Sequence, residues 1–122
     1  MISIKVPWPV SVNAAYRTFR NRMILSREGR DYKDTCIQHI MVERHYSQAD
    51  FPLCGRLKVV YEVYQPDKRR RDLANLDKLL SDCMTSGGVW EDDSQIDIIT
   101  FDRWQKKIIP GGLIIANIEV LE

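Results

Sequence analysis

Apolar and polar side chains alternate in four segments of the chain, and alternation with a period of two predicts β-strands. The clearest of these segments are residues 2–6 and 56–64, where every second side chain is aliphatic or aromatic. Two further strands are predicted at 95–104 and 113–121. The sequence Pro110-Gly111-Gly112 supplies a turn between these last two strands.

A different spacing, with apolar residues three and four positions apart, predicts two helices. The first is expected over about 27–45, because Ser26 is a good N-terminal cap for it. The second is expected to begin near Asp72 and to run to about Thr85. Gly87-Gly88 follows it at once and is typical of a helix end.

Residues 18–25 fit either a short strand or a hairpin loop, so the predicted order of elements is β(β)αβαββ. This order is typical of an α+β fold in which two helices pack on one face of a small mixed sheet. The length of 122 residues suits one domain, and we expect residues 1–122 to form it. No apolar run approaches a membrane span, and residues 1–6 lack the features of a signal peptide. We therefore expect a cytoplasmic protein that does not enter a membrane.

The charges of the chain are nearly balanced but unevenly distributed. Charged residues make up 29% of the chain and the net charge is only +1, which argues against a protein that coats nucleic acid through bulk charge. Basic residues concentrate in the N-terminal third and at Lys68–Arg71, and acidic ones at Glu91–Asp93. The three cysteines, Cys36, Cys54 and Cys83, have no zinc-site spacing and are odd in number, so we expect reduced thiols.

The segment 67–78, DKRRRDLANLDK, carries the most chemical information. Its basic run, Lys68-Arg69-Arg70-Arg71, leads into a predicted helix start, where free backbone N–H groups favour anions. The run fits either a solvated surface or a phosphate-binding segment. Asp72 fits either a helix cap or a metal ligand. On a helical wheel, Lys78 and Asp82 share the polar face of this helix with Arg71, Ala74 and Asn75.

A second acidic site is Glu91-Asp92-Asp93, which follows Trp90. Three adjacent carboxylates repel one another unless a cation lies near them or water screens them. Mg²⁺ prefers carboxylate oxygens, so the segment fits either a metal site or a solvent-exposed loop. We expect Trp90 to anchor this loop in the core.

Together these segments resemble the RusA family of Holliday junction resolvases. The pattern Asp-x-x-Arg-Arg-Asp-Leu-x-Asn-Leu-x-Lys runs here from Asp67 to Lys78, and Gly-x-Trp-x-Asp-Asp runs from Gly88 to Asp93. Pro-Trp-Pro-x-Ser-x-Asn-x-x-Tyr-Arg at 7–17 and Ser-x-Glu-Gly-x-x-Tyr at 26–32 also match, in the same order. The resemblance implies a homodimer, of a kind frequent in phages and prophages, that binds four-way DNA junctions and makes paired, symmetric nicks with Mg²⁺.

The resemblance also assigns roles to single residues. Asp72 and Asp93 match two catalytic, metal-binding aspartates, with Asp92 beside the second, and Lys78 matches a lysine important for catalysis. The positions that it places near DNA are Lys68, Arg69, Arg70, Arg71, Asn13, Tyr16 and Arg17.

One position departs from the family pattern Asp-Leu-Asp-Asn-Leu. Ala74 stands where the second catalytic aspartate belongs. Alanine is the best helix former and is unremarkable on a surface helix. We nevertheless favour the interpretation that Ala74 results from a change of aspartate to alanine that inactivates the nuclease and leaves the fold intact. Whether this chain is active is therefore an open question.

Three rival functions stay open at this point. A non-catalytic protein that binds four-way junctions would keep the basic surface and need no metal. A metal-dependent hydrolase acting on nucleotides is a second rival, although the chain has no phosphate-binding GxxxxGK[ST] loop. A purely structural α+β domain is the third, and the match over nearly the whole chain argues against it.

Overall fold

Two β-sheets and two main helices build the protein. The computed structural model describes residues 1–103 and 105–121. The elements, in chain order, are β1 (Ile2–Val6), α1 (Val12–Ala15), β2 (Tyr16–Phe19), β3 (Arg22–Leu25), α2 (Arg27–Ser47), β4 (Arg56–Tyr64), the 3₁₀ turn η1 (Leu73–Leu76), α3 (Asp77–Ser86), the 3₁₀ turn η2 (Asp93–Gln95), β5 (Ile96–Asp102) and β6 (Leu113–Leu121).

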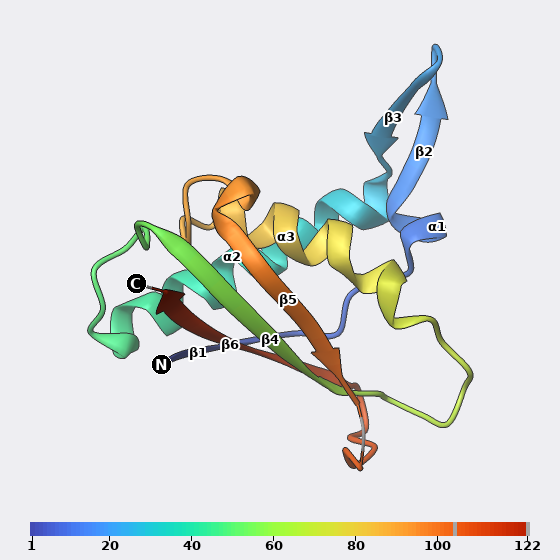
Figure 1. Cartoon of the computed structure of the whole chain (residues 1–122). Helices are drawn as coiled ribbons and strands as arrows, with labels where there is room; N and C mark the ends of the chain where they lie inside the picture. Colours follow the sequence, from blue (N-terminus) through green and yellow to red (C-terminus); the bar gives the residue numbers. More distant parts are fainter. Residues whose placement is uncertain (104, 122) are drawn as a thin grey trace.

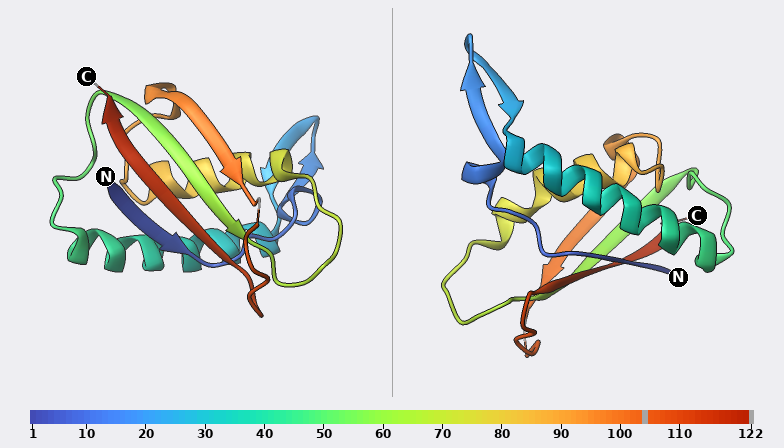
Figure 2. Two further views of the ribbon diagram at one scale, coloured as in Figure 1. Left: turned by 60° about the horizontal axis from the view of Figure 1, so that its bottom comes forward. Right: turned by 180° about the vertical axis from the view of Figure 1, so that it is seen from behind.

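The larger sheet is mixed and has the strand order β1-β6-β4-β5. β6 is antiparallel to both β1 and β4, whereas β5 runs parallel to β4. Figures 1 and 2 show α2 and α3 on the same face of this sheet. The predicted α+β fold, with a mixed sheet and two helices on one face, is therefore confirmed.

The alternation along the strands places the core between the sheet and the helices. In β4 the predicted inward side chains, Leu57, Val59, Tyr61 and Val63, are all buried. Trp90 is fully buried as well, which confirms that it anchors the loop after α3. β5 differs, because most of its side chains are exposed along the open edge of the sheet. A parallel neighbour for β4 was not predicted, since strand pairing depends on contacts far apart in the sequence.

The first helix begins where the sequence predicts. The Ser26 hydroxyl accepts a hydrogen bond from the Gly29 N–H at 3.0 Å, which caps α2. Gly29 lies so close to the preceding segment that a Cβ there would approach the Ala15 carbonyl oxygen to 2.2 Å. Close contact at this glycine fixes the root of the β2–β3 hairpin onto α2. The segment 18–25, predicted as either a strand or a hairpin loop, is a hairpin, and it begins two residues earlier than predicted. It follows the short helix α1, and this helix was not predicted.

The prediction of the second helix is wrong for its first turn. Residues 73–76 form the 3₁₀ turn η1, and the α-helix begins only at Asp77. Asp72 has an extended backbone and its side chain makes no capping hydrogen bond. A 3₁₀ turn has 3.0 residues per turn rather than 3.6, so the single polar face predicted for 71–82 is broken between η1 and α3.

Cys36 and Cys83 are buried and Cys54 is exposed, all as free thiols, as expected. Among the described residues, no helix combines the length and the apolar content that a membrane crossing requires.

Candidate functional site

A hollow of about 350 Å³ lies between α3 and the start of β5. Asp93 borders it together with side chains from one face of α3: Asp77, Lys78, Ser81 and Asp82. The hydroxyl of Ser81 donates to Asp77 Oδ1 at 3.0 Å, so these two residues are tied to each other. Three carboxylates and one ammonium therefore share this hollow, and it is the acidic site of the chain.

Asp93 is held in a fixed orientation by the buried indole below it. The Trp90 Nε1–H donates to Asp93 Oδ1 at 2.9 Å, and the Thr85 hydroxyl donates to the same oxygen at 2.5 Å. The second oxygen, Oδ2, has no hydrogen-bond partner within the described ranges 1–103 and 105–121. One oxygen is thus used to orient the carboxylate, and the other is left for a ligand.

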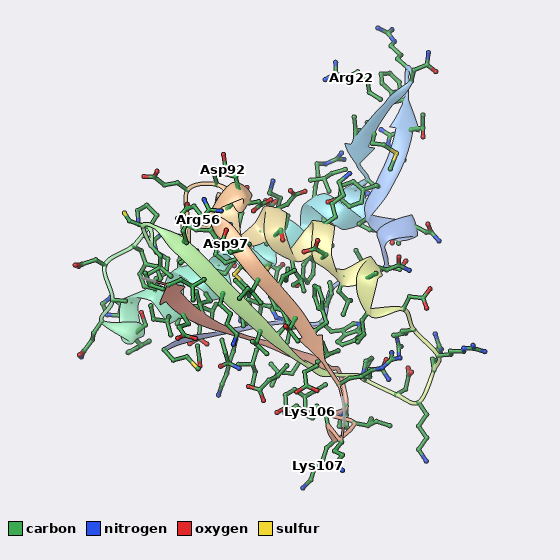
Figure 3. All side chains as sticks on the ribbon, viewed as in Figure 1. Arg22, Arg56, Asp92, Asp97, Lys106 and Lys107 are labelled. Carbon is green, nitrogen blue, oxygen red and sulfur yellow. The ribbon has the colours of Figure 1, made fainter. Side chains whose placement is uncertain are left out.

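Asp92, the neighbouring acid, has a structural task in its own loop. Its carboxylate accepts from the Ser94 N–H at 2.9 Å, and Gln95 Oε1 accepts from the Asp92 N–H at 3.0 Å. This reciprocal pair is a capping box that starts η2. Figure 3 shows Asp92 at the outer end of the loop. The loop is rigid because Gln95 also donates to the carbonyl oxygens of Leu53 and Gly55.

Lys78 extends from α3 over the root of the β2–β3 hairpin. Its ammonium lies 4.3 Å from the centre of the Tyr16 ring, and the Tyr16 hydroxyl donates to Asp82 Oδ2 at 2.8 Å. Burial, followed by the bond to Asp82, raises the pKa of Tyr16 well above its usual value, so it remains a neutral donor. Tyr16 therefore connects the hairpin to two residues of the acidic hollow.

The basic run borders a second, larger hollow of about 930 Å³. Arg69, Arg70, Arg71 and Asp72 line it together with Trp8 and Ser11. Asp67 organises the run, because Oδ1 accepts from Arg71 Nη1 at 2.8 Å and from the Arg69 N–H at 2.9 Å. The guanidinium of Arg71, followed by the Arg69 N–H, holds the pKa of the Asp67 carboxyl below its usual value. Arg71 also lies 5.4 Å from the centre of the Trp8 indole.

The two hollows border successive parts of the η1–α3 segment: Asp72, Asn75 and Leu76 line the larger one, and Asp77, Lys78, Ser81 and Asp82 line the smaller one. Asp72 precedes η1, whereas Asp93 bonds to Thr85 in the last turn of α3. Helical rises of 1.5 and 2.0 Å per residue put about 20 Å of axial length between Asp72 and Thr85, the residue to which Asp93 is bonded. The structure thus brings Lys78 and Asp93 together and leaves Asp72 with the arginines. Ala74 is exposed in η1 between them.

The remaining predicted DNA-binding residues are placed as follows. Lys68 is exposed beside the larger hollow, Asn13 is exposed in α1, and Arg17 is exposed in β2. Tyr16 is mostly buried at the hairpin root. The sequence analysis did not single out Asp77, Ser81 and Thr85, although their four-residue spacing on one helix face was a usable signal.

Carboxylates of this kind suit a hard divalent cation such as Mg²⁺ in their chemistry. Within the described part of the chain, no three acidic, histidine or cysteine residues are grouped as a metal site. Asp77 and Asp82, like Asp93, each accept a hydrogen bond from one hydroxyl through one oxygen, and Asp93 is oriented by the buried Trp90 indole as well. Mg²⁺ usually takes one or two carboxylates and completes its shell with water, so Asp93 with one further carboxylate would fit it.

Comparisons with known proteins show the family to which the chain belongs. Residues 7–115 match the family described as endodeoxyribonuclease RusA. The chain is 40% identical over 94 residues to the crossover junction endodeoxyribonuclease RusA of Escherichia coli strain K12, covering 77% of this chain and 75% of that protein. It is 41% identical over 93 residues to the protein of the same name from Enterobacteria phage 82, covering 76% and 74%. The match includes nearly all of the residues that build both hollows, and the chain belongs to the RusA family of endodeoxyribonucleases.

Proposed function

We propose that this protein is a Mg²⁺-dependent endonuclease that binds four-way DNA junctions as a homodimer and resolves them by paired nicks. The observation that carries the proposal is Asp93, a carboxylate fixed through one oxygen beside Lys78. A basic hollow at the other end of η1–α3 supplies the phosphate-binding surface that such an enzyme needs. The proposal includes one domain over residues 1–122 and a cytoplasmic location, where junction DNA would be met.

Each site residue has a role in this proposal. Asp72, Asp93 and the neighbouring Asp92 would hold Mg²⁺, which supplies an activated water and charge stabilisation at the scissile phosphate. Lys78, which borders the same hollow as Asp93, would neutralise charge on that phosphate. Contacts that position the DNA backbone come from Lys68, Arg69, Arg70, Arg71, Asn13, Tyr16 and Arg17.

The separation of Asp72 and Asp93 along η1–α3 supports a dimer. Mg²⁺ binds its oxygens at about 2.1 Å, so we do not expect two aspartates separated by about 20 Å of helical rise to share one ion within a chain. In a two-fold dimer, Asp72 of one protomer can approach Asp93 of the other, which gives two equivalent sites. The open edge of β5 supports this arrangement, because Ile98 and Ile99 are 46% and 40% exposed along it and Ile99 borders the acidic hollow.

Ala74 weakens the catalytic part of the proposal for this particular chain. An aspartate at this exposed position of η1 would add a carboxylate close to Asp72. With alanine there, metal affinity falls and a negative charge near the DNA is removed, so we expect junction binding to survive better than cutting. A non-catalytic junction-binding protein is the second candidate function, and Ala74 is the observation that favours it.

The test is a nicking assay on a labelled four-way junction. It compares the chain with its Ala74→Asp variant, in Mg²⁺ and in EDTA, and measures junction binding alongside. We expect both proteins to bind the junction and Ala74→Asp to make paired, Mg²⁺-dependent nicks. Binding without cutting by either protein would favour the second candidate. Absence of any preference for the junction over linear duplex would overturn both.

Dimerisation is measured separately by sedimentation. We expect the chain to sediment as a dimer, and Ile98→Asp to shift it to monomer and to abolish the nicking gained by Ala74→Asp. Nicking by a sedimenting monomer would contradict a site shared between protomers.

A further inference from the structure

The β2–β3 hairpin carries a surface from which the proposed function uses Arg17 alone. The two strands form a separate two-stranded sheet and extend away from the rest of the molecule (Figure 1; from behind in Figure 2). Such a hairpin is marginally stable alone, so its order depends on its root. There Tyr16 is buried and the Ser26 N–H donates to the Ala15 carbonyl at 2.8 Å. The root is fixed, and the tip is free to contact a ligand.

The two faces of the hairpin differ sharply in chemistry. The register pairs Arg17 with Ile24 and Phe19 with Arg22, and successive side chains in a strand point to opposite faces. One face therefore presents Arg17, Phe19 and Arg22. Thr18 and Met23 pair on the other face, where the Thr18 hydroxyl contacts the Met23 sulfur at 3.8 Å.

Phe19 is an exposed aromatic ring held between arginines. Half of its surface is accessible, and the guanidinium carbons of Arg17 and Arg20 lie 5.9 and 5.3 Å from its ring centre. Arg20 occupies the turn with φ of 50°, a left-handed conformation that glycine or asparagine adopts more easily. Turn formation alone does not account for an arginine there. Figure 3 shows Arg22 at the far end of the hairpin, well away from the sheet.

We propose that the hairpin is a wedge that reads the branch point of the DNA. We define the wedge surface as Arg17, Phe19, Arg20 and Arg22. Phe19 stacks on bases that are unstacked at the branch point, and the three arginines bind the flanking phosphates. Apolar side chains inserted at base steps and aromatic rings under unpaired bases are established modes of DNA recognition. No acidic residue occurs in residues 16–25 to repel the phosphates.

The root of the hairpin relates this wedge to the acidic hollow. Tyr16, at the other end of the same strand, bonds to Asp82 and lies under the Lys78 ammonium. A base held at Phe19 is consequently at a fixed separation from Lys78 and Asp93. The wedge thus selects a branched substrate and sets which phosphate reaches the hollow. This inference rests on the proposed junction binding.

The test measures binding, so it needs no cutting activity and uses the chain without the Ala74→Asp change. The DNA is a four-way junction that carries 2-aminopurine beside the branch point. Unstacking of that base on binding raises its fluorescence. We expect Phe19→Ala to abolish the rise and to weaken junction binding about ten-fold, equivalent to about 1.4 kcal/mol, within the range for one base–aromatic stack. Its affinity for linear duplex, measured by anisotropy, should change less than about two-fold, since duplex offers no unstacked base.

Two matched variants control this experiment. Met23→Ala removes an apolar side chain of similar exposure, 60% against 50% for Phe19, from the opposite face, and we expect it to behave like the parent chain. Phe19→Trp keeps an aromatic ring that can stack on a base and should retain the affinity for the junction. Circular dichroism of each variant checks that the hairpin change leaves the fold intact.

Two results would overturn the wedge. One is a Phe19→Ala variant that binds junction and duplex as the parent does. The other is an equal loss for both DNAs, which would make Phe19 a general DNA contact. If the parent itself shows no preference for the junction, the proposed function fails as well. If the parent prefers the junction and only the Phe19 effects are missing, the proposed function stands and the wedge alone is wrong.

Discussion

The two ends of the η1–α3 segment are built in opposite ways. At the Asp93 end, a fully buried indole, a threonine and a capped turn hold the acidic group in one orientation. At the Asp72 end, the aspartate is exposed, makes no capping bond and follows a run of exposed basic residues. The Asp93 carboxylate is held by groups of its own chain, whereas the Asp72 side chain has no hydrogen-bond partner among residues 1–103 and 105–121. We infer that the Asp93 end is the fixed half of the site and that the Asp72 end is completed by DNA and by a second protomer.

The largest effect is expected from removing the indole below Asp93. Trp90→Ala leaves a large cavity in the core, so we expect it to lower the free energy of unfolding by about 3–5 kcal/mol. Urea denaturation followed by circular dichroism measures this change. Trp90→Phe, which keeps most of the apolar volume and loses the N–H donor, should cost much less. A small loss for Trp90→Ala would contradict a rigid Asp93 end.

A smaller effect is expected from Asp93 itself. Asp93→Ala leaves the buried Trp90 N–H with only the Thr85 hydroxyl as acceptor, so we expect a loss of about 1–2 kcal/mol. Asp93→Asn keeps an oxygen at the acceptor position and serves as the control. If both variants were as stable as the parent, the hydrogen bonds to Asp93 would not organise the loop.

The basic end is expected to respond to pH through Asp67. Since Arg71 and the Arg69 N–H lower its pKa, the charged carboxylate stabilises this segment above the pKa that Asp67 has in the unfolded chain. That contribution is lost as the pH falls through the lower, folded-state pKa. In an NMR titration, we expect Arg71→Ala to raise the pKa of Asp67 towards its usual value. An unchanged titration would show that Arg71 does not hold Asp67 in solution.

The smallest effect is expected from Asp72. Because its side chain caps nothing, Asp72→Ala should change the free energy of unfolding by no more than about 0.5 kcal/mol. The same change should abolish nicking in the Ala74→Asp background. A large destabilisation would instead assign Asp72 to the fold, and would remove the contrast between the two ends.

Local patterns predicted most of the elements. Ser26 marked the start of α2, and the alternation along β4 placed Leu57, Val59 and Tyr61 in the core. These features succeed because capping and side-chain alternation depend only on neighbours in the sequence. The 3₁₀ turn at 73–76 was not predicted, because a helical wheel assumes 3.6 residues per turn throughout and a 3₁₀ turn has 3.0.

The site residues remain predictions from the motifs, and the arrangement of those residues could not be predicted from the sequence. The motifs identified Asp72, Lys78 and Asp93, yet their spacing did not indicate that Asp72 lies in another hollow. That separation depends on the length of α3 and on the packing of the loop over Trp90, which are tertiary features. The hydrogen bond from Tyr16 to Asp82 likewise joins residues far apart in the chain, and no local sequence pattern predicts it.

The position of the hairpin depends on Gly29, a residue outside the hairpin. No side chain fits between α2 and the Ala15 carbonyl, so any substitution displaces the root from which β2 and β3 extend. A random-mutagenesis selection for loss of junction binding would then return changes at Gly29, a buried position without a charge or a hydrogen-bonding side chain. Such alleles would be mistaken for folding defects or for lost DNA contacts. The actual defect would be a misdirected hairpin, in a protein whose core and arginines are intact.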